Sequence, residues 1–150
     1  MLYNNAGYVP SSLYEIPFGQ GRILKEGNDI TIVSYSNMVN VVKDAISSDE
    51  LSEISAELID LQTLSPLDMQ TIITSVSKTK KLLVCQEAPA NSSVGSTVIS
   101  NVVQSDVFSS LSIAPKLVSG LHSPMPSAKH LETTVIPQKE DIMQAIKDMV

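Results

Sequence analysis

Disulfide bonds, metal sites and reactive thiols need residues that this sequence nearly lacks. Cys85 is the only cysteine among 150 residues, so no internal disulfide can form, and such usage fits a reducing compartment. We expect Cys85, which ends an apolar run, to be a buried structural thiol. The two histidines, His122 and His130, stand eight positions apart in a proline-containing stretch, which is not a metal-ligand spacing. The sequence therefore predicts no metal site.

Positive charge and long apolar runs are scarce as well. Because 10 lysine and arginine residues face 16 aspartate and glutamate residues, the formal net charge is −6. This charge disfavours unaided binding to nucleic acid or to an anionic membrane, and it suits a basic partner. The longest apolar runs fall far short of a membrane span. Residues 1–5 contain no positively charged n-region, and no apolar h-region follows them. Because both parts of a secretory signal are missing, we expect a protein that is not secreted.

Motifs of self-contained active sites are also missing. The stretch from Ser34 to Met38, which follows an apolar run, contains no glycine that would let a pyrophosphate approach, and no phosphate-loop pattern occurs elsewhere. The chain has no G-x-S-x-G, H-E-x-x-H or C-x-x-C motif. We therefore expect no catalytic residue and no cofactor bound by this chain alone. Whether the chain is part of an enzyme stays open at this point.

What the sequence does contain is an alternation of β-branched runs and amphipathic helical stretches. Its hydrophobic fraction of 43% and charged fraction of 17% are typical of one globular domain. We expect an extended lead-in over residues 1–22 and a domain over residues 23–150. The predicted strands are Arg22–Glu26, Ile30–Tyr35, Ala56–Leu61, Lys81–Cys85 and Ala114–Ser119, and the predicted helices begin near residues 37, 66, 93 and 140.

Two of these helices carry start signals. Ser36 is placed to cap the first one. In the second, Ser65 is placed to cap, Pro66 occupies the first helical position, and Asp68 supplies a carboxylate near the positive end of the helix dipole. A proline-rich loop is expected between Gly120 and the last helix.

Strands that alternate with helices over short connections require a mostly parallel sheet with right-handed crossovers. The predicted fold class is therefore α/β, a three-layer α/β/α arrangement of the doubly wound kind, with one antiparallel edge strand. Ligands of such sheets sit beyond the carboxyl ends of the strands. The candidate residues for an active-site edge or an interface are those near these ends: Asp60, Gln62, Gln86, Glu87 and His122. Glu87 or Asp60 would serve as a general acid or base if it were buried near a ligand, and would otherwise be a solvated carboxylate.

Several segments, in order, resemble a known family. Residues 14–19 (YEIPFG) and 26–35 (EGNDITIVSY) resemble the opening of the C-terminal domain of the β subunit of thiamine-diphosphate-dependent 2-oxo acid dehydrogenases. Residues 59–68 (IDLQTLSPLD) resemble that family's "IDLRTLSPLD" segment, which is the most specific match. Residues 86–89 (QEAP) and 120–126 (GLHSPMP) resemble its "HEAP" and "GxDxPxP" segments. The resemblance spans nearly the whole chain.

The resemblance implies a transketolase C-terminal-like fold within the E1 component of a pyruvate, branched-chain 2-oxo acid or acetoin dehydrogenase. In that family thiamine diphosphate and Mg²⁺ belong to the parent complex, and the C-terminal domain contributes contacts rather than catalysis. The implied partners are the E1 α subunit, a second E1 β chain and the E2 peripheral subunit-binding domain, so an oligomer is expected. The implied compartment is the bacterial cytoplasm or, in a eukaryote, the mitochondrial matrix.

The chain departs from the family pattern at polar positions. Gln62 replaces an arginine, Gln86 a histidine and His122 an aspartate, while Ser92 and Ser93 replace a glycine pair. Replacing arginine removes a fork that binds carboxylate or phosphate, and replacing histidine removes a group that titrates near neutral pH. A divergent or non-catalytic member of the family, the equivalent domain of a transketolase or 1-deoxyxylulose-phosphate synthase, and a free-standing flavodoxin-like binding module are the alternatives.

Overall fold

The computed structural model describes residue 8 and residues 10–150, in which five strands form one mixed sheet. The spatial order of the strands is β1-β3-β2-β4-β5. Their bounds are Arg22–Lys25 (β1), Ile30–Ser34 (β2), Ala56–Asp60 (β3), Leu82–Pro89 (β4) and Lys116–Gly120 (β5). Strands β2 to β5 run parallel, and β1 pairs with β3 in the antiparallel sense at the edge. The predicted fold class, including the antiparallel edge strand, is confirmed.

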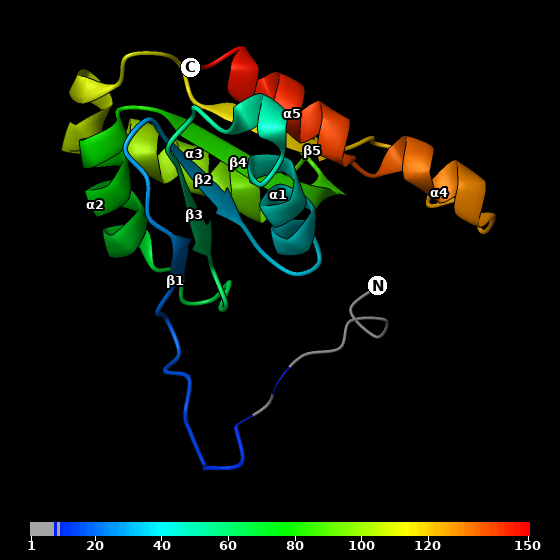
Figure 1. Ribbon diagram of the computed structural model, residues 1–150, viewed down its shortest axis with the longest axis horizontal. Coiled ribbons are helices and arrows are strands. Elements are labelled where there is room, and N and C mark those ends of the chain that lie inside the picture. Colours follow the sequence, from blue (N-terminus) through cyan, green and yellow to red (C-terminus); the bar gives the residue numbers. More distant parts are fainter. Residues whose placement is uncertain (1–7, 9) are drawn as a thin grey trace.

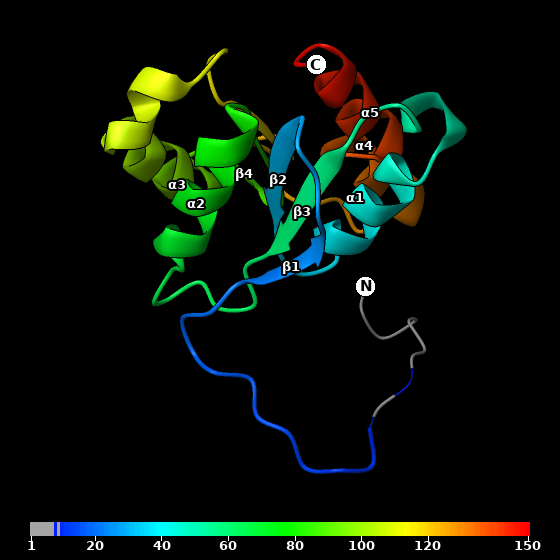
Figure 2. The same ribbon diagram turned by 60° about the vertical axis from the view of Figure 1, so that its left-hand side comes forward.

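Helices cover both faces of this sheet (Figure 2). The bounds of the helices are Met38–Ile46 (α1), Met69–Thr79 (α2), Val94–Val103 (α3), Lys129–Val135 (α4) and Lys139–Lys147 (α5), and two short 3₁₀ turns are Asp49–Leu51 (η2) and Asp106–Ser110 (η3). Helices α1 and α5 bury one apolar cluster against the sheet, and α2 and α3 bury the other. Every residue of β2 is buried, because this strand is covered on both faces. In the part of the chain that the structure describes, no helix is long and apolar enough to cross a membrane.

The predicted start of α2 was wrong by three residues. The helix begins at Met69, and the residue that caps it is Asp68, whose carboxylate accepts a hydrogen bond from the Thr71 amide. Ser65 and Pro66 belong to the preceding loop. A carboxylate directly before the helix reaches the free amides of its first turn, which a serine hydroxyl three residues earlier does not.

Ser36 likewise does not cap α1. The N-cap residue is Asn37, no side chain caps this helix, and Ser36 lies in the left-handed region with φ of 58°. Ser36 contributes its backbone carbonyl instead, which accepts from the Val39 amide at 3.3 Å.

Further element boundaries differ from the prediction, and one helix was not predicted. Strand β4 continues to Pro89 instead of ending at Cys85, so Gln86 and Glu87 lie within the strand and not beyond it. Strand β5 starts at Lys116 rather than at Ala114. The expected proline-rich loop contains α4, a short helix at the far right of Figure 1. These differences arise at element ends, where local propensity is weak and tertiary pairing decides.

The turn after β1 does not form a hairpin with β2, because β3 lies between them. In this turn the amides of Asn28 and Asp29 donate to the carbonyl of Ser55 at 2.8 and 2.9 Å, which ties the turn to the start of β3. Gly27 is buried against the same backbone, and a Cβ on it would overlap Ala56 and Glu57. The absence of a side chain at Gly27 therefore allows β1 to cross to the far side of β3.

Candidate functional site

All five candidate residues lie toward one edge of the sheet, where β2 to β5 end. We call this end of the sheet, at the carboxyl termini of its parallel strands, the carboxyl edge. The lead-in enters β1 at the same end. The chain passes from β2 to its neighbour β3 on one side and from β4 to β5 on the other, so the winding direction reverses between β2 and β4. Doubly wound sheets bind ligands at this kind of switch point. Tyr35, Gln86 and Glu87 border it here.

The side chain of Gln86 fills the switch point. Gln86 is fully buried, and its Nε2 donates to the carbonyls of Ala88 at 2.9 Å and Pro89 at 3.1 Å. Its Oε1 accepts from the Gly95 amide, in the first turn of α3, at 2.8 Å. The Tyr35 hydroxyl donates to the same oxygen at 3.4 Å. With its amide group engaged in this way, Gln86 joins β2, β4 and α3 and is a structural residue of the edge.

Tyr35 and Glu87 are the titratable pair beside Gln86. Burial raises the pKa of Tyr35, and the negative charge of Glu87 raises it further. Tyr35 therefore keeps its proton at neutral pH and acts as a hydrogen-bond donor. Glu87 is half-buried at the carboxyl end of β4. Together they can donate and accept hydrogen bonds, but they do not form an activated nucleophile with its base.

Asp60 and Gln62 form a second, separate group at the end of β3. One oxygen of Asp60 accepts from the Gln62 amide at 3.2 Å, and Gln62 has a left-handed backbone with φ of 53° and an exposed side chain. The carboxylate of Asp60 is therefore engaged by a backbone amide of its own local turn. His122 lies beyond β5 and is exposed.

The structure does not bring these five residues into one constellation. Among residue 8 and residues 10–150, the side-chain hydrogen bonds at these positions join Asp60 to the Gln62 amide and Gln86 to Tyr35, Ala88, Pro89 and Gly95, and none joins one of the five candidate side chains to another. In the same part of the chain no three histidine, cysteine or carboxylate groups are placed to hold a metal ion.

Asp68 fixes the lead-in to this edge. Its carboxylate accepts from the Gly21 amide at 2.8 Å and from the Thr71 hydroxyl at 2.6 Å, in addition to its capping bond. Burial acts to raise the pKa of Asp68, but the hydrogen bonds from Thr71 and Gly21 outweigh it, so the pKa is lowered. The Gly19 amide adds a bond to Thr63 at 2.9 Å.

Large apolar side chains are exposed on the segments that lie at or lead into the carboxyl edge. Phe18 of the lead-in is 86% exposed and Leu121 of the loop after β5 is 58% exposed. The same description applies to Leu13, Tyr14, Ile16, Leu64 and Met125. In Figures 1 and 2 the backbone of residues 10–18 runs away from the sheet.

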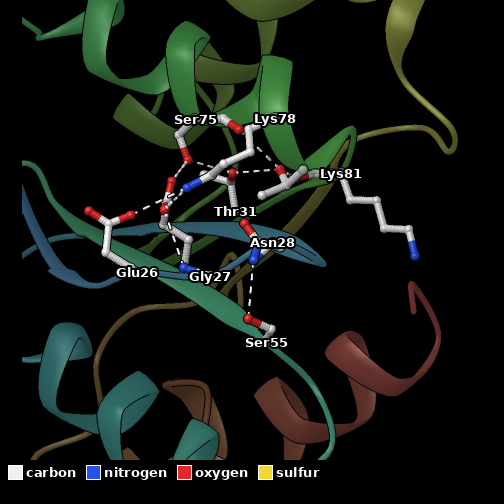
Figure 3. A network of polar contacts seen from close by, with 10 residues as sticks. Glu26, Gly27, Asn28, Thr31, Ser55, Ser75, Lys78 and Lys81 are labelled. Carbon is white, nitrogen blue, oxygen red and sulfur yellow. Dashed lines mark hydrogen bonds and ion pairs between the residues drawn. The ribbon is translucent and has the colours of Figure 1, made fainter.

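A buried ionic cluster, which no sequence pattern predicted, lies at the opposite end of the parallel strands (Figure 3). The side chain of Glu57 on β3 is only 1% exposed, and its carboxylate accepts hydrogen bonds from Ser75 and Lys78 and one from the Gly27 amide at 3.3 Å. Lys78 also pairs with Glu26 at 3.3 Å. Within a run of apolar residues Glu57 reads as an outward-facing strand residue, and only the packing of α2 over β3 buries it.

Two opposing effects set the pKa of Glu57. Burial raises it, because the charged form loses its hydration, and the hydrogen bonds from Lys78, Ser75 and Gly27 lower it. The bonds prevail, so the pKa lies below its ordinary value and Glu57 is ionised at neutral pH. The pKa of Lys78 is raised by its bond to Glu57. Thr31 extends the network inward through bonds of 2.7 Å to Ser75 and to Thr79.

Comparison with known proteins places this fold and sequence in a family. The model of the transketolase C-terminal domain matches residues 19–142. The pyruvate dehydrogenase E1 component subunit beta of Rickettsia conorii is 40% identical over 147 residues, which are 98% of this chain and 45% of that protein. The acetoin:2,6-dichlorophenolindophenol oxidoreductase subunit beta of Cupriavidus necator is 36% identical over 97% of this chain and 43% of that protein. The chain thus spans less than half the length of these relatives.

A solved structure shares the fold. A split gene transketolase, described as an inactive beta4 tetramer, superimposes with a TM-score of 0.74 and 23% sequence identity over 95% of this chain and 45% of that one. This likeness supports the architecture found here.

Proposed function

This chain belongs to the transketolase C-terminal domain family, and on this premise we propose that it is the subunit-contact domain of the β subunit of a 2-oxo acid dehydrogenase E1 component. In this role it supports oxidative decarboxylation on thiamine diphosphate without being catalytic alone. The observation that carries the proposal is the similarity over 98% of the chain to pyruvate dehydrogenase E1 β subunits. We propose the E1 α subunit and a second E1 β chain as its partners.

The carboxyl edge supports a contact role. Its switch point is filled by Gln86, whose amide group is engaged with the protein, and large apolar side chains are exposed on the segments that lie at or lead into it. Burying apolar side chains such as Phe18 and Leu121 against a partner would be favourable by about 1.5–3 kcal/mol for each one fully covered. The edge therefore offers binding energy for a subunit and little chemistry for a substrate.

The residues present do not fit thiamine diphosphate and its Mg²⁺. A diphosphate needs a close approach of backbone amides, and the connection from β2 to α1 contains no glycine. In the described part of the chain no group of three metal ligands is assembled. We derive no catalytic step for the cofactor here and propose that other parts of the E1 component hold it.

A reconstitution experiment tests this proposal. The chain is assayed for 2-oxo acid-dependent reduction of a dye, first alone and then fused to the upstream half of an E1 β subunit together with an E1 α subunit. We expect no turnover from the chain alone and restored turnover in the assembly. Turnover by the chain alone, or failure of the assembly to form, contradicts the proposal. Binding of sugar phosphates or of flavin in calorimetry would favour the transketolase-like or flavodoxin-like alternative.

Matched variants locate the contact surface. Phe18→Ser and Leu121→Ser each remove an exposed apolar group near the carboxyl edge, and Phe108→Ser removes one that is 52% exposed on η3, at the other end of the domain. We expect the first two variants to weaken assembly at least tenfold in sedimentation velocity and the third to leave it unchanged. Equal effects of all three variants would contradict an interface at this edge.

We further propose that the E2 peripheral subunit-binding domain docks on this chain in the assembled complex. The net charge of −6 supports a basic partner, because opposite charges steer association. Titration of the assembled E1 with that domain should show an association rate that falls steeply as salt is raised. Binding that is insensitive to salt, or absent, contradicts this docking.

The compartment follows from the same proposal. We expect the chain in the cytoplasm of a bacterium or in the mitochondrial matrix of a eukaryote, since the similar E1 β subunits of Ascaris suum and Pisum sativum are mitochondrial by name. Fractionation of the source cells with an antibody to the chain checks this. Recovery in a secreted or membrane fraction contradicts it.

A further inference from the structure

A groove of about 390 Å³ lies between the edge strand β1 and helix α2, at the side of the sheet away from β5. Ile23 of β1 lines one wall, and Thr71 and Thr74 of α2 line the other. Glu57 and Lys78 of the buried ionic cluster are also among its lining residues. Most of the surface that the groove presents is apolar. It therefore combines an apolar wall with one charged corner.

The charged corner carries a net negative charge. Two carboxylates, Glu26 and Glu57, share the single ammonium of Lys78. The side chain of Glu26 is 76% exposed, and one of its oxygens pairs with Lys78 at 3.3 Å. The other oxygen accepts no hydrogen bond from any residue that the structure describes. A cation entering the groove would find this oxygen available, whereas an anion would be repelled.

We propose that this groove binds the side chain of a lysine presented by a partner protein. The aliphatic stem of the lysine lies along Ile23 and the threonine methyl groups, and its ammonium meets the free oxygen of Glu26. A lysine carries a compact charge on an apolar stem, which matches an apolar wall that ends at one free oxygen. Arginine fits less well, because its planar fork seeks two carboxylate oxygens and Lys78 already holds one of them.

The groove is formed by β1, α2 and the buried ionic cluster, and it is independent of the role proposed for the carboxyl edge. The groove belongs to the side of the sheet that α2 covers, and Phe18 and Leu121 are not among its lining residues. Failure of the lysine site would leave the proposed subunit contacts untouched, and failure of those contacts would leave the lysine site untouched.

Amide chemical shifts of the ¹⁵N-labelled chain test the proposal. The probes are Nα-acetyl-lysine N-methylamide, its norleucine counterpart, which lacks the ammonium, and its arginine counterpart. We expect the lysine probe to shift the amides of Gly27, Thr74 and Lys78 with the lowest dissociation constant of the three. Equal affinity of the lysine and norleucine probes would show that the charge has no part in binding and would overturn the proposal, as would tighter binding of the arginine probe.

Two charge-matched variants complete the test. Glu26→Gln should weaken binding of the lysine probe about threefold, a factor consistent with an exposed ion pair, and should leave the norleucine probe unaffected. Asp44→Asn, on the exposed side of α1 across the sheet, removes the same charge elsewhere and should have no effect. Because Glu26 is exposed, the variant is expected to fold, which the unchanged amide spectrum away from the groove verifies. An unaltered affinity in Glu26→Gln would refute the site.

Discussion

Lys78 on α2 neutralises the buried carboxylate of Glu57 on β3, while its own side chain is 40% exposed. In the described part of the chain it is the one cation within ion-pair distance of Glu57. The pair joins the helix layer to the sheet, and the Gly27 amide ties the turn after β1 to the same carboxylate. A charge that burial alone would disfavour is therefore held by three elements at once.

Removing this cation should destabilise the domain. Lys78→Met leaves Glu57 buried without a counter-ion, a change that reaches 3–5 kcal/mol in fully buried pairs, and the partial exposure of Lys78 places the expected loss at about 2–3 kcal/mol. Urea unfolding followed by circular dichroism measures it. Lys43→Met, on the exposed side of α1, is the matched control and should change the free energy of unfolding by less than about 0.5 kcal/mol. Equal losses in the two variants would show that the ion pair contributes nothing.

Glu57 and Lys78 of this cluster, together with Asp68 at the carboxyl edge, predict how stability depends on pH. The pKa of Glu57 lies below its ordinary value of 4.5 and that of Asp68 below 3.8. The unfolded chain therefore binds more protons in acid, so the free energy of unfolding falls as the pH drops from about 5 through the folded pKa values. The raised pKa of Lys78 acts only in alkali, where its stabilisation is lost as the pH rises above 10.5.

In Glu57→Gln the free energy of unfolding should fall less steeply in acid, because the variant has no carboxylate to protonate at that position. Unfolding in urea at a series of pH values between 3 and 7 compares the variant with the parent chain. Glu53→Gln, an exposed carboxylate outside the cluster, is the control. An equally steep fall of the free energy of unfolding in Glu57→Gln and in the parent would contradict the lowered pKa of Glu57.

Gln86→Met tests the structural role given to Gln86. The variant keeps the volume but removes the partner of the Gly95 amide and of two carbonyls, and each buried polar group left unpaired costs about 1–3 kcal/mol. We expect a loss of about 2–4 kcal/mol in thermal unfolding. Gln104→Met, an exposed residue at the end of α3, should stay within about 0.5 kcal/mol of the parent. A near-neutral Gln86→Met would show that these hydrogen bonds contribute little to stability.

Gly27→Ala should release β1 from the sheet. The added Cβ would overlap the backbone of Ala56 and Glu57, which cannot move aside as a side chain can, so a loss of about 1–3 kcal/mol or more is expected. Hydrogen exchange at the amides of Ile23 and Lys25 should accelerate. Gly21→Ala is the matched control, because its nearest contact would be 3.4 Å from the Asp60 carbonyl. Slow exchange of β1 in Gly27→Ala would argue against this role of the turn.

Much of the fold could be predicted from residue patterns. The near-continuous β-branched run Ile30–Tyr35 predicts a strand covered on both faces, and the stripes in α1, α2, α3 and α5 predict helices that each bury one side. Helix caps were harder to predict. Ser65 and Asp68 are both good capping residues, and the choice between them depends on the residue at which the preceding loop ends. Helix α4 was missed because a proline-rich segment carries little helical pattern.

The candidate site was predicted less well. The pattern placed Gln86 and Glu87 after a strand, whereas they lie within β4, and it could not show that Gln86 is buried and that its side chain fills the switch point. Glu57 and Asp60 are both carboxylates of the same predicted strand. The pattern could not show that Glu57 is the buried one, while Asp60 accepts from a local amide. These outcomes depend on which helix packs over which strand.

The sequence by itself determined the fold class, the single buried thiol and the acidic charge, because periodicity and composition act locally or additively along the chain. The tertiary structure alone decided the crossing of β1 to the far side of β3, the burial of Glu57 beneath α2 and the gathering of apolar residues near the carboxyl edge. Each of these brings together residues 20 or more positions apart, such as Gly27 and Glu57. Their contacts depend on closing the chain into one packed body, and no local pattern encodes that closure.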